Sequence, residues 1–381
     1  MTGAATDSSS TRLPDLLASV VRGDPIEAAR WPAIDIDAFC AAAEAHGVLP
    51  LVADRMRRMT SAAAPGALAA RVAHLAEQHA VLDLERESAL RAALAALDEA
   101  GLQPLVFKGA HLAYRDYARP DLRPRVDSDV LIPPDHRARD AAHRVLSALG
   151  YDSAPHVGGD FVMTQRLYVL RDGAHVRHAV DVHWRIATPQ VFSRVLLHEE
   201  LLRDAERIPR LGAAARGPSG PHALLIACLH RVAHHAGFDC LIWLCDIDRV
   251  ARRLTADEWN RFVRLARDRQ LRAVCAAGLA GAAERLRTPV PDAVRAGLDH
   301  PGEAPEASAG YFDPPRDSVT AALRDLRALS SWRDRARLVR EHLLPPVKYM
   351  RGVYAPGSRA PLAWLYVRRL SAGARKWWRT T

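Results

Sequence analysis

The chain is poor in several features that mark particular protein classes. It has no hydrophobic run near the roughly 20 residues needed to span a bilayer, so no transmembrane helix is predicted. From Met1 to Thr11 there is no basic residue, and no apolar segment precedes Leu13, so we expect no secretory signal and a cytoplasmic location. Sequence repeats of a fixed period are also lacking, which excludes a solenoid.

Cysteine is scarce and scattered. The 5 cysteines include no Cys-x-x-Cys pair of the kind that binds zinc or performs thiol redox chemistry. We expect reduced and mostly buried thiols at Cys40, Cys228, Cys240, Cys245 and Cys275.

Acidic residues are absent from one region only, the last tenth of the chain. The whole sequence of 381 residues is 49% hydrophobic and 25% charged, as in ordinary globular proteins, and has a net charge of +9. From His342 to Thr381 there is no Asp or Glu. That segment contains eight basic residues, Lys348, Arg351, Arg359, Arg368, Arg369, Arg375, Lys376 and Arg379.

The residue pattern divides the chain into five parts. Helical spacing of apolar residues dominates before residue 100 and again after residue 189, whereas short apolar runs with clear stops predict strands between them. We expect a disordered N-terminus (1–12), a helical region (13–100), an α/β core (101–188), a helical domain (189–310) and a basic helical C-terminal region (311–381).

Within the α/β core the expected elements follow from their boundaries. A helix is predicted from Asp135 to Leu149, closed by Gly150. Strands are predicted at 104–107, 130–132, 165–170 and 179–186, with a turn at 171–173 joining the last two.

Carboxylates cluster at the head of one predicted strand. Asp127 and Asp129 are two residues apart, so on a strand their side chains point to the same face. Two like charges side by side need a cation or a proton to neutralise them, which makes the pair a candidate metal clamp. Asp181 is the best candidate for a third carboxylate because it sits in mid-strand, on the same face as His183 and Arg185.

Two other polar features accompany the carboxylates. Lys108 and Gly109 end a strand and open a helix, where backbone N–H groups and an ammonium could meet a phosphate. Arg123 could neutralise a phosphate or hold Asp127 or Asp129 in place, and the sequence does not separate the two roles.

These motifs together resemble a known family. The order is Phe-Lys-Gly, a helix with a tyrosine, Arg-Pro-x-x-Asp-x-Asp before an aliphatic strand, and then Val-Asp-Val-His-Trp. From about Leu105 to Arg185 the chain resembles the uncharacterised nucleotidyltransferase family of the DNA polymerase β-like superfamily. It departs from the superfamily at Ala110, where Gly or Ser usually follows the first glycine, in the longer gap before the carboxylates, and at Ser128, where an aliphatic residue is usual.

The resemblance implies a fold and an activity. The fold would be α+β, a mixed sheet flanked by helices, with mainly helical N-terminal and C-terminal regions. Nucleoside monophosphate would pass from an NTP, with ATP the expected donor, to an acceptor hydroxyl or phosphate, and pyrophosphate would leave. The acceptor would be a small molecule, a peptide or a protein, and two Mg²⁺ ions, or Mn²⁺, would assist.

The resemblance also implies a role for each matching residue. Asp127, Asp129 and Asp181 would be the catalytic metal ligands, and Asp181 could also help to deprotonate the acceptor. Lys108 and Gly109, with Arg123, would bind the nucleotide. Alternative interpretations are a noncatalytic nucleotide-sensing or partner-binding module of the same fold, or a nucleic-acid-binding protein that uses the basic tail.

Other polar clusters are less indicative of a site. His230 and His234 share a helical face, but no Glu accompanies them as in a metalloprotease, so we favour packing or a substrate contact over metal binding. Asp246 and Asp248 lie in a predicted helix, where residues two apart diverge, so they should not form a clamp.

The basic tail has several interpretations. Its Trp and Arg residues could lie on an anionic membrane, bind nucleic acid, or guide an acidic substrate inward. Simple helix packing with solvated arginines is the plainest alternative, and nucleic acid is the less favoured partner because no recognised nucleic-acid module accompanies the charge.

Overall fold

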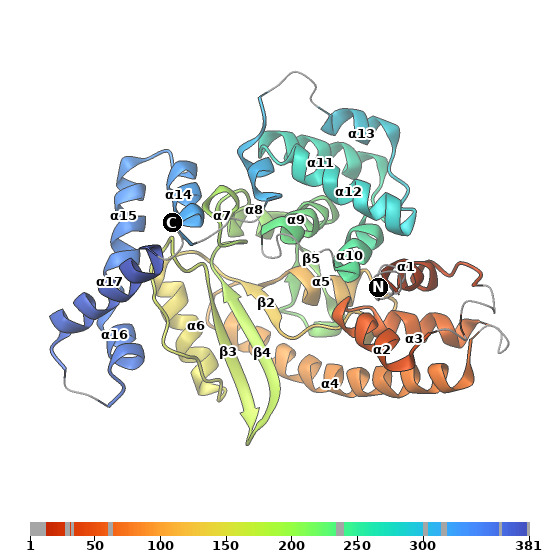
Figure 1. Ribbon diagram of the computed structural model, residues 1–381, viewed down its shortest axis with the longest axis horizontal. Coiled ribbons are helices and arrows are strands. Elements are labelled where there is room, and N and C mark those ends of the chain that lie inside the picture. The colour runs from red at the N-terminus through yellow and green to blue at the C-terminus, as the bar shows by residue number, and fades with distance from the viewer. Residues whose placement is uncertain are drawn as a thin grey trace, which may run out of the picture.

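A mixed sheet of six strands lies at the centre of the protein (Figure 1). The computed structural model describes residues 13–26, 31, 34–59, 64–233, 240–299, 304–313, 318–357 and 360–378. The strand order is β3-β4-β2-β1-β6-β5. The strands are β1 (Leu105–Val106), β2 (Ser128–Leu131), β3 (Gln165–Asp172), β4 (His175–His183), β5 (Glu206–Arg207) and β6 (Arg216–Gly217).

The centre of the sheet combines both kinds of strand pairing. β2 and β4 are parallel neighbours, whereas β1 runs antiparallel to β2 and β3 antiparallel to β4. This arrangement, with its covering helices, confirms the predicted α+β fold. β4 ends at His183, so the predicted continuation of the strand to Ile186 is wrong.

The sheet extends past residue 188, where the sequence suggested only helices. β5 and β6 form a two-residue hairpin ladder, and β6 pairs with β1 in parallel. Strands this short carry no alternating pattern, which explains why the sequence does not reveal them.

Helices cover both faces of the sheet (Figure 1). One face packs on α6 (His136–Ala148) and the second half of α4 (Gly66–Glu99), through Val130 and Val180. The other face packs through Leu105 and Leu131 into a second and larger hydrophobic core. α5 (Lys108–Arg115) follows β1 directly.

The larger core joins helices that precede the sheet along the chain with helices that follow it. It unites α1 (Leu13–Arg22), α2 (Ile36–Ala45) and α3 (Leu49–Arg58) with helices that follow the sheet. The helices that follow are α7 (Gln190–Ser193), α8 (His198–Arg203), α9 (Gly220–Ala233), α10 (Leu241–Ala251), α11 (Ala256–Asp268), α12 (Arg272–Leu286) and α13 (Asp292–Leu298). All five cysteines are buried free thiols, as expected.

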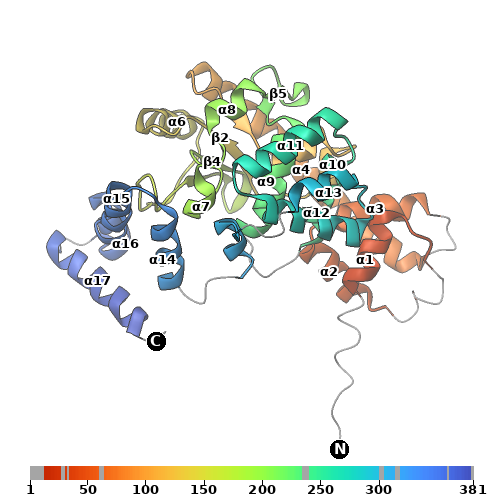
Figure 2. The same ribbon diagram turned by 90° about the horizontal axis from the view of Figure 1, so that it is seen from above.

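Four helices end the described chain and stand at one side of the sheet (Figures 1 and 2). They are α14 (Ser318–Ala328), α15 (Trp332–Leu343), α16 (Val347–Tyr354) and α17 (Leu362–Trp378). Short 3₁₀ helices occur at Pro120–Leu122, Pro209–Leu211 and Ala307–Tyr311. In the described part of the chain, no helix is both long and apolar enough to cross a membrane.

The helix predicted from Asp135 onward shows why local signals succeed. Asp135 caps α6, since its carboxylate accepts a hydrogen bond of 3.0 Å from the N–H of Ala138. Gly150 follows the helix with a φ of +86°, a conformation that glycine adopts without strain. The predicted disordered segment 1–12 lies outside the described residues.

Candidate active site

The parallel pairing of β2 with β4 brings the predicted carboxylates together. The register places Asp129 opposite Asp181 and Leu131 opposite His183. Because side chains alternate along a strand, Asp181 and His183 point to the same face of β4. The three polar side chains therefore meet on one face of two central strands.

The carboxylates and the imidazole are close enough to share one ion. Nε2 of His183 lies 2.9 Å from Oδ1 of Asp129 and 3.3 Å from Oδ2 of Asp181. One ligand atom from each residue fits within 4.8 Å of the others. We call these residues, Asp129, Asp181 and His183, the metal cluster.

The metal cluster fits a divalent cation for a second reason. Oδ1 of Asp181 is buried and has no hydrogen-bond donor among the described residues, although Oδ2 accepts one from the Gln165 side chain. A buried carboxylate oxygen without a donor is costly unless a cation serves it. Carboxylates are ligands that Mg²⁺ and Mn²⁺ use, whereas an imidazole is better suited to transition-metal ions than to Mg²⁺.

Lys108 is the positive charge that the structure places at the cluster. Its ammonium lies 2.8 Å from Oδ1 of Asp129 and 3.4 Å from Nε2 of His183. Lys108 is the first residue of α5 and has a φ of +52°, a left-handed conformation that costs a non-glycine residue about 1 kcal/mol. This backbone turn aims the side chain at the carboxylates rather than along the helix.

The start of α5 is held firmly against β2. The N–H of Phe107 donates to the backbone oxygen of Asp129 at 3.1 Å. The Phe107 ring meets the His183 ring edge to face, with ring centroids 4.9 Å apart. No side chain caps α5 at Phe107, so the first-turn N–H groups beside the cluster are suited to an anion.

The charges in the cluster perturb one another. Burial favours a neutral Asp129, but the ammonium of Lys108 and the hydrogen bond from His183 outweigh it and hold the pKa of Asp129 well below its ordinary value. Burial and Lys108 likewise oppose charge on His183, yet the carboxylates of Asp129 and Asp181 raise its pKa. The cluster therefore favours an ionised Asp129, the form that binds a metal.

Asp127 lies beside the cluster rather than on the strand. β2 begins at Ser128, so Asp127 is in the preceding loop, and its side chain is half-buried. Burial, followed by the negative charges of Asp129 and Asp181, raises the pKa of Asp127 to about 6. The sequence predicted that Asp127 and Asp129 both lie on one strand. That prediction is wrong for Asp127, because only Asp129 belongs to β2.

Arg123 is engaged elsewhere. Its guanidinium makes a buried bidentate ion pair with Asp246 of α10, with a closest contact of 2.7 Å. The hydroxyl of Tyr117 donates to the same carboxylate at 2.8 Å. Of the two roles that the sequence left open for Arg123, holding Asp127 or Asp129 in place is therefore not the one found, because its guanidinium pairs with Asp246.

Gly109 makes room for that ion pair. A Cβ added at Gly109 would lie 3.0 Å from Nη2 of Arg123, a contact closer than side chains normally tolerate. The guanidinium therefore packs against the backbone of α5 at the predicted nucleotide-binding turn. Asp246 and Asp248 do not form a clamp, as predicted, since Asp248 binds Arg252 and Thr288 instead.

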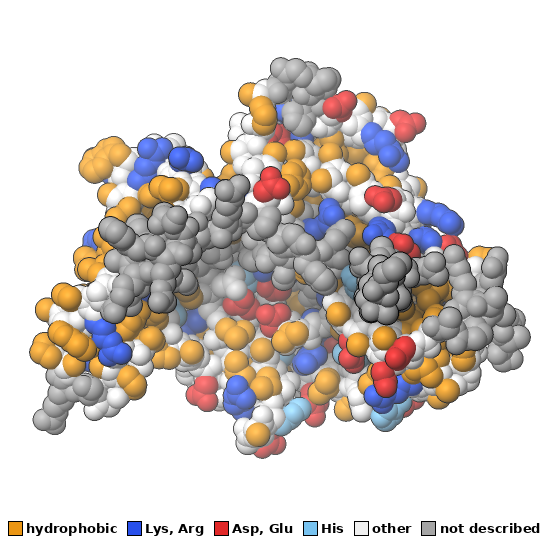
Figure 3. All heavy atoms as spheres, viewed as in Figure 1, with side chains coloured by type: hydrophobic (Ala, Val, Ile, Leu, Met, Phe, Trp, Pro, Cys, Tyr) orange, Lys and Arg blue, Asp and Glu red, His pale blue; other side chains and the backbone are white. Residues whose placement is uncertain are grey.

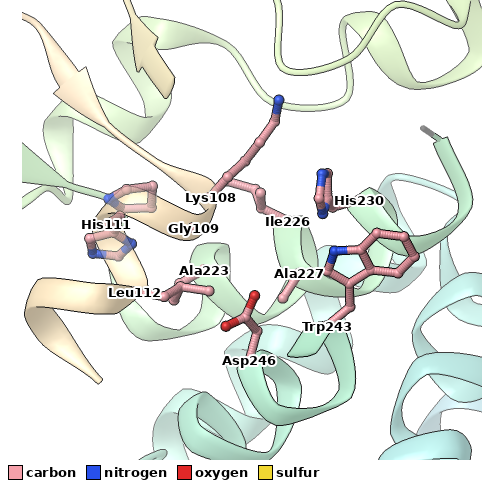
Figure 4. Close-up of a pocket in the computed structure, with 11 residues that line it drawn as sticks. Lys108, Gly109, His111, Leu112, Ala223, Ile226, Ala227, His230, Trp243 and Asp246 are labelled. Carbon is pink, nitrogen blue, oxygen red and sulfur yellow. The ribbon is translucent and has the colours of Figure 1, made fainter. Parts of the chain in front are cut away.

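A pocket opens beside Gly109, between α5, α9 and α10 (Figure 4). Lys108 extends away from Asp246 on one side, while His230 and Trp243 face each other on the other. The His230 and Trp243 rings meet edge to face, with centroids 5.7 Å apart. His234, the partner predicted for His230 on the same helical face, lies outside the described residues.

The surface shows where the site opens. Acidic side chains gather in a hollow over β2, near the middle of the face seen in Figure 3. His183 is the site residue to which the sequence assigned no metal role. The alternation Asp-x-His in the sequence indicates that the imidazole of His183 lies on the same face as Asp181. That pattern was the signal from which a ligand role for His183 could have been inferred.

Comparison with known proteins agrees with this geometry. None of the curated proteins compared with the chain gives a significant match. A family described as uncharacterised nucleotidyltransferase matches residues 32–287, about two thirds of the chain, which include the sheet, the metal cluster and α10. The chain therefore belongs to this uncharacterised nucleotidyltransferase family.

Proposed function

We propose that this protein transfers a nucleoside monophosphate from an NTP to an acceptor hydroxyl or phosphate, with release of pyrophosphate. The observation that carries the proposal is the metal cluster, two carboxylates and an imidazole brought within 4.8 Å on adjacent parallel strands. Membership in a nucleotidyltransferase family supports it.

Asp129, Asp181 and His183 would hold a divalent cation, with Asp127 beside them to hold a second. We propose Mg²⁺, with Mn²⁺ as a substitute. Bound there, the cation would neutralise the triphosphate and the charge that develops on the leaving pyrophosphate. The rigid strands keep the carboxylates in place, so little reorganisation is needed during the reaction.

Lys108 and the first turn of α5 would receive the phosphates. The ammonium now pairs with Asp129, and it is near enough to turn toward a phosphate once a cation balances that carboxylate. The N–H groups at the start of α5 add partial positive charge. Arg123 is a positioning residue in this proposal, because it holds α5 against α10 through Asp246.

In the reaction, the acceptor oxygen forms a bond to the α-phosphorus as the bond to the bridging oxygen of pyrophosphate breaks. The acceptor proton leaves to a nearby base, and Asp181 is our candidate. ATP is the proposed donor, and a small molecule, peptide or protein is the proposed acceptor.

The test measures whether nucleotide binding requires both the metal and the cluster. Melting temperatures are recorded with ATP, GTP, CTP and UTP, each with and without Mg²⁺, for the wild type and for Asp181→Asn. Asp181 is chosen because its loss leaves Lys108 paired with Asp129. Asp172→Asn, the same change at the exposed far end of β3, is the matched control.

We expect the correct nucleotide to stabilise the wild type and the control by about 2.7 kcal/mol at 100 times its Kd, only with Mg²⁺. Asp181→Asn should lose this response. Acceptors are then screened with that nucleotide by pyrophosphate release. Stabilisation that is equal with and without Mg²⁺, and equal in Asp181→Asn, would contradict the proposal and favour a noncatalytic nucleotide-binding module.

A further inference from the structure

The outer face of α17 carries apolar side chains that have no cover in the described part of the chain. Trp364, Val367 and Leu370 are 53%, 61% and 44% exposed. They are three residues apart, so they follow one side of the helix. Isolated exposed apolar residues are common, but a row of three on one helix face is unusual.

The opposite face of α17 is already used. Leu365 is fully buried against Met350 of α16, and the hydroxyl of Tyr366 donates to the backbone oxygen of Pro345 at 2.6 Å. These contacts hold α17 on α16 as a helical hairpin (Figure 2). The row of Trp364, Val367 and Leu370 is therefore not needed for folding of the hairpin.

Apolar exposure continues at the junction of α15 and α16. Leu343, Leu344 and Val347 are exposed there, on either side of the pair Pro345 and Pro346. Figure 3 shows hydrophobic side chains beside Lys and Arg side chains over α16.

The sequence around these apolar residues is basic. The last 40 residues contain eight basic side chains and no acidic one. The guanidinium of Arg368 lies 5.6 Å from the centre of the Trp364 ring, next to the apolar row. Arg369 is 5.7 Å from the Tyr349 ring on the packed side, so it belongs to the hairpin core.

This chemistry argues against two other occupants of the face. A second copy of the hairpin would bring two basic surfaces together, which costs free energy. Single-stranded nucleic acid needs flat rings on which bases stack, but Val367 and Leu370 are aliphatic. Aliphatic and Trp side chains bordered by arginine match the boundary between lipid headgroups and acyl chains.

We propose that α17 is a peripheral anchor that lies flat on an anionic lipid surface. The apolar row enters the acyl boundary, and the basic residues bind lipid phosphates. Each Lys or Arg near such a surface strengthens binding about fivefold, and the attraction weakens as salt rises.

The experiment is sedimentation of the full-length protein with vesicles. One set contains phosphatidylglycerol and phosphatidylcholine, and the other contains phosphatidylcholine alone. The test variant is Trp364→Ser with Val367→Ser and Leu370→Ser. The control variant is Val81→Ser with Leu84→Ser, which removes equally exposed apolar side chains from α4, a helix with several glutamates.

We expect the wild type and the α4 control to bind the phosphatidylglycerol vesicles and to bind phosphatidylcholine alone at least about tenfold more weakly. The triple variant should bind about 100-fold more weakly, given the transfer free energy of the lost side chains. Lys348→Glu with Arg368→Glu should also weaken binding and reduce its salt dependence.

Three outcomes would overturn the anchor. They are equal binding by the triple variant and the wild type, equal binding to both vesicle sets, and binding to RNA with none to vesicles. Unchanged melting temperature in the triple variant shows that a loss of binding is not a loss of fold. NTP stabilisation is scored separately, so failure of the anchor leaves the proposed transferase activity unaffected.

Discussion

Replacing Lys108 by methionine should make the protein less stable and more responsive to divalent cations. Methionine keeps the apolar stem and the left-handed backbone at this position, so the change isolates the ammonium. The ammonium lies 2.8 Å from Asp129, and both side chains are buried. Breaking a buried ion pair costs about 3–5 kcal/mol, and we expect the lower end because His183 still contacts Asp129.

The loss can be expressed as a melting temperature. Unfolding entropy of about 2.1 cal/mol/K per residue gives about 0.8 kcal/mol/K for 381 residues, so 3 kcal/mol lowers the melting temperature by about 4 °C. A divalent cation at 100 times its Kd raises the free energy of unfolding by about 2.7 kcal/mol. Mg²⁺ or Mn²⁺ should therefore restore most of the loss in Lys108→Met.

The assay is thermal unfolding without nucleotide, across a series of Mg²⁺ and Mn²⁺ concentrations. The wild type should respond at higher concentrations than Lys108→Met, because its ammonium competes with the metal. Arg125→Met is the matched control, since it breaks a buried pair with Asp83 at 2.6 Å that has no place in the metal cluster. Equal metal responses in Lys108→Met and the wild type, or rescue of Arg125→Met by the same ions, would refute the reasoning.

Three more predictions follow from particular contacts. With Mn²⁺ bound, we expect the electron spin-echo spectrum to show coupling to the imidazole nitrogen, and His183→Gln should remove that coupling and reduce the preference for Mn²⁺ over Mg²⁺; an unchanged spectrum would show that the imidazole is not a ligand. Gly109→Ala should lower the free energy of unfolding by about 1–3 kcal/mol in denaturant titrations, because its Cβ would press on Arg123, while the metal response persists; unchanged stability would contradict this packing. Burial, with the charges of Arg125 and Arg86, lowers the pKa of His178 to about 3, so between roughly pH 6.5 and 3 the unfolded chain binds a proton that the folded chain does not. Because of this group, the free energy of unfolding should fall by about 1.4 kcal/mol per pH unit as the pH drops through that range. His178→Gln should reduce this dependence of the unfolding free energy on pH. The same loss of stability at acidic pH in His178→Gln and in the wild type would contradict the prediction.

Local sequence signals were sufficient for the central elements of the fold. Short apolar runs joined by a turn at 171–173 located β3 and β4, and the cap at Asp135 with Gly150 located α6. They failed where the information is not local. The ends of β4 and the two-residue strands β5 and β6 depend on pairing partners, which no short stretch of sequence specifies.

The sequence by itself determined which residue types could form a site, because the two-residue period of a strand places Asp181 and His183 on one face. Only the tertiary structure decided which strand lies beside them. The parallel register of β2 with β4 joined Asp129 to that face and left Asp127 in the loop.

The tertiary structure also determines the role of each basic side chain near the site. Lys108 and Arg123 are both basic residues near the predicted turn, and nothing in their order along the chain separates them. The left-handed backbone of Lys108 aims its ammonium at Asp129, whereas α10 supplies Asp246 to Arg123 from more than 100 residues away. Charges in a protein interior pair with whatever the fold brings within a few ångströms, and that distance is a property of packing rather than of sequence.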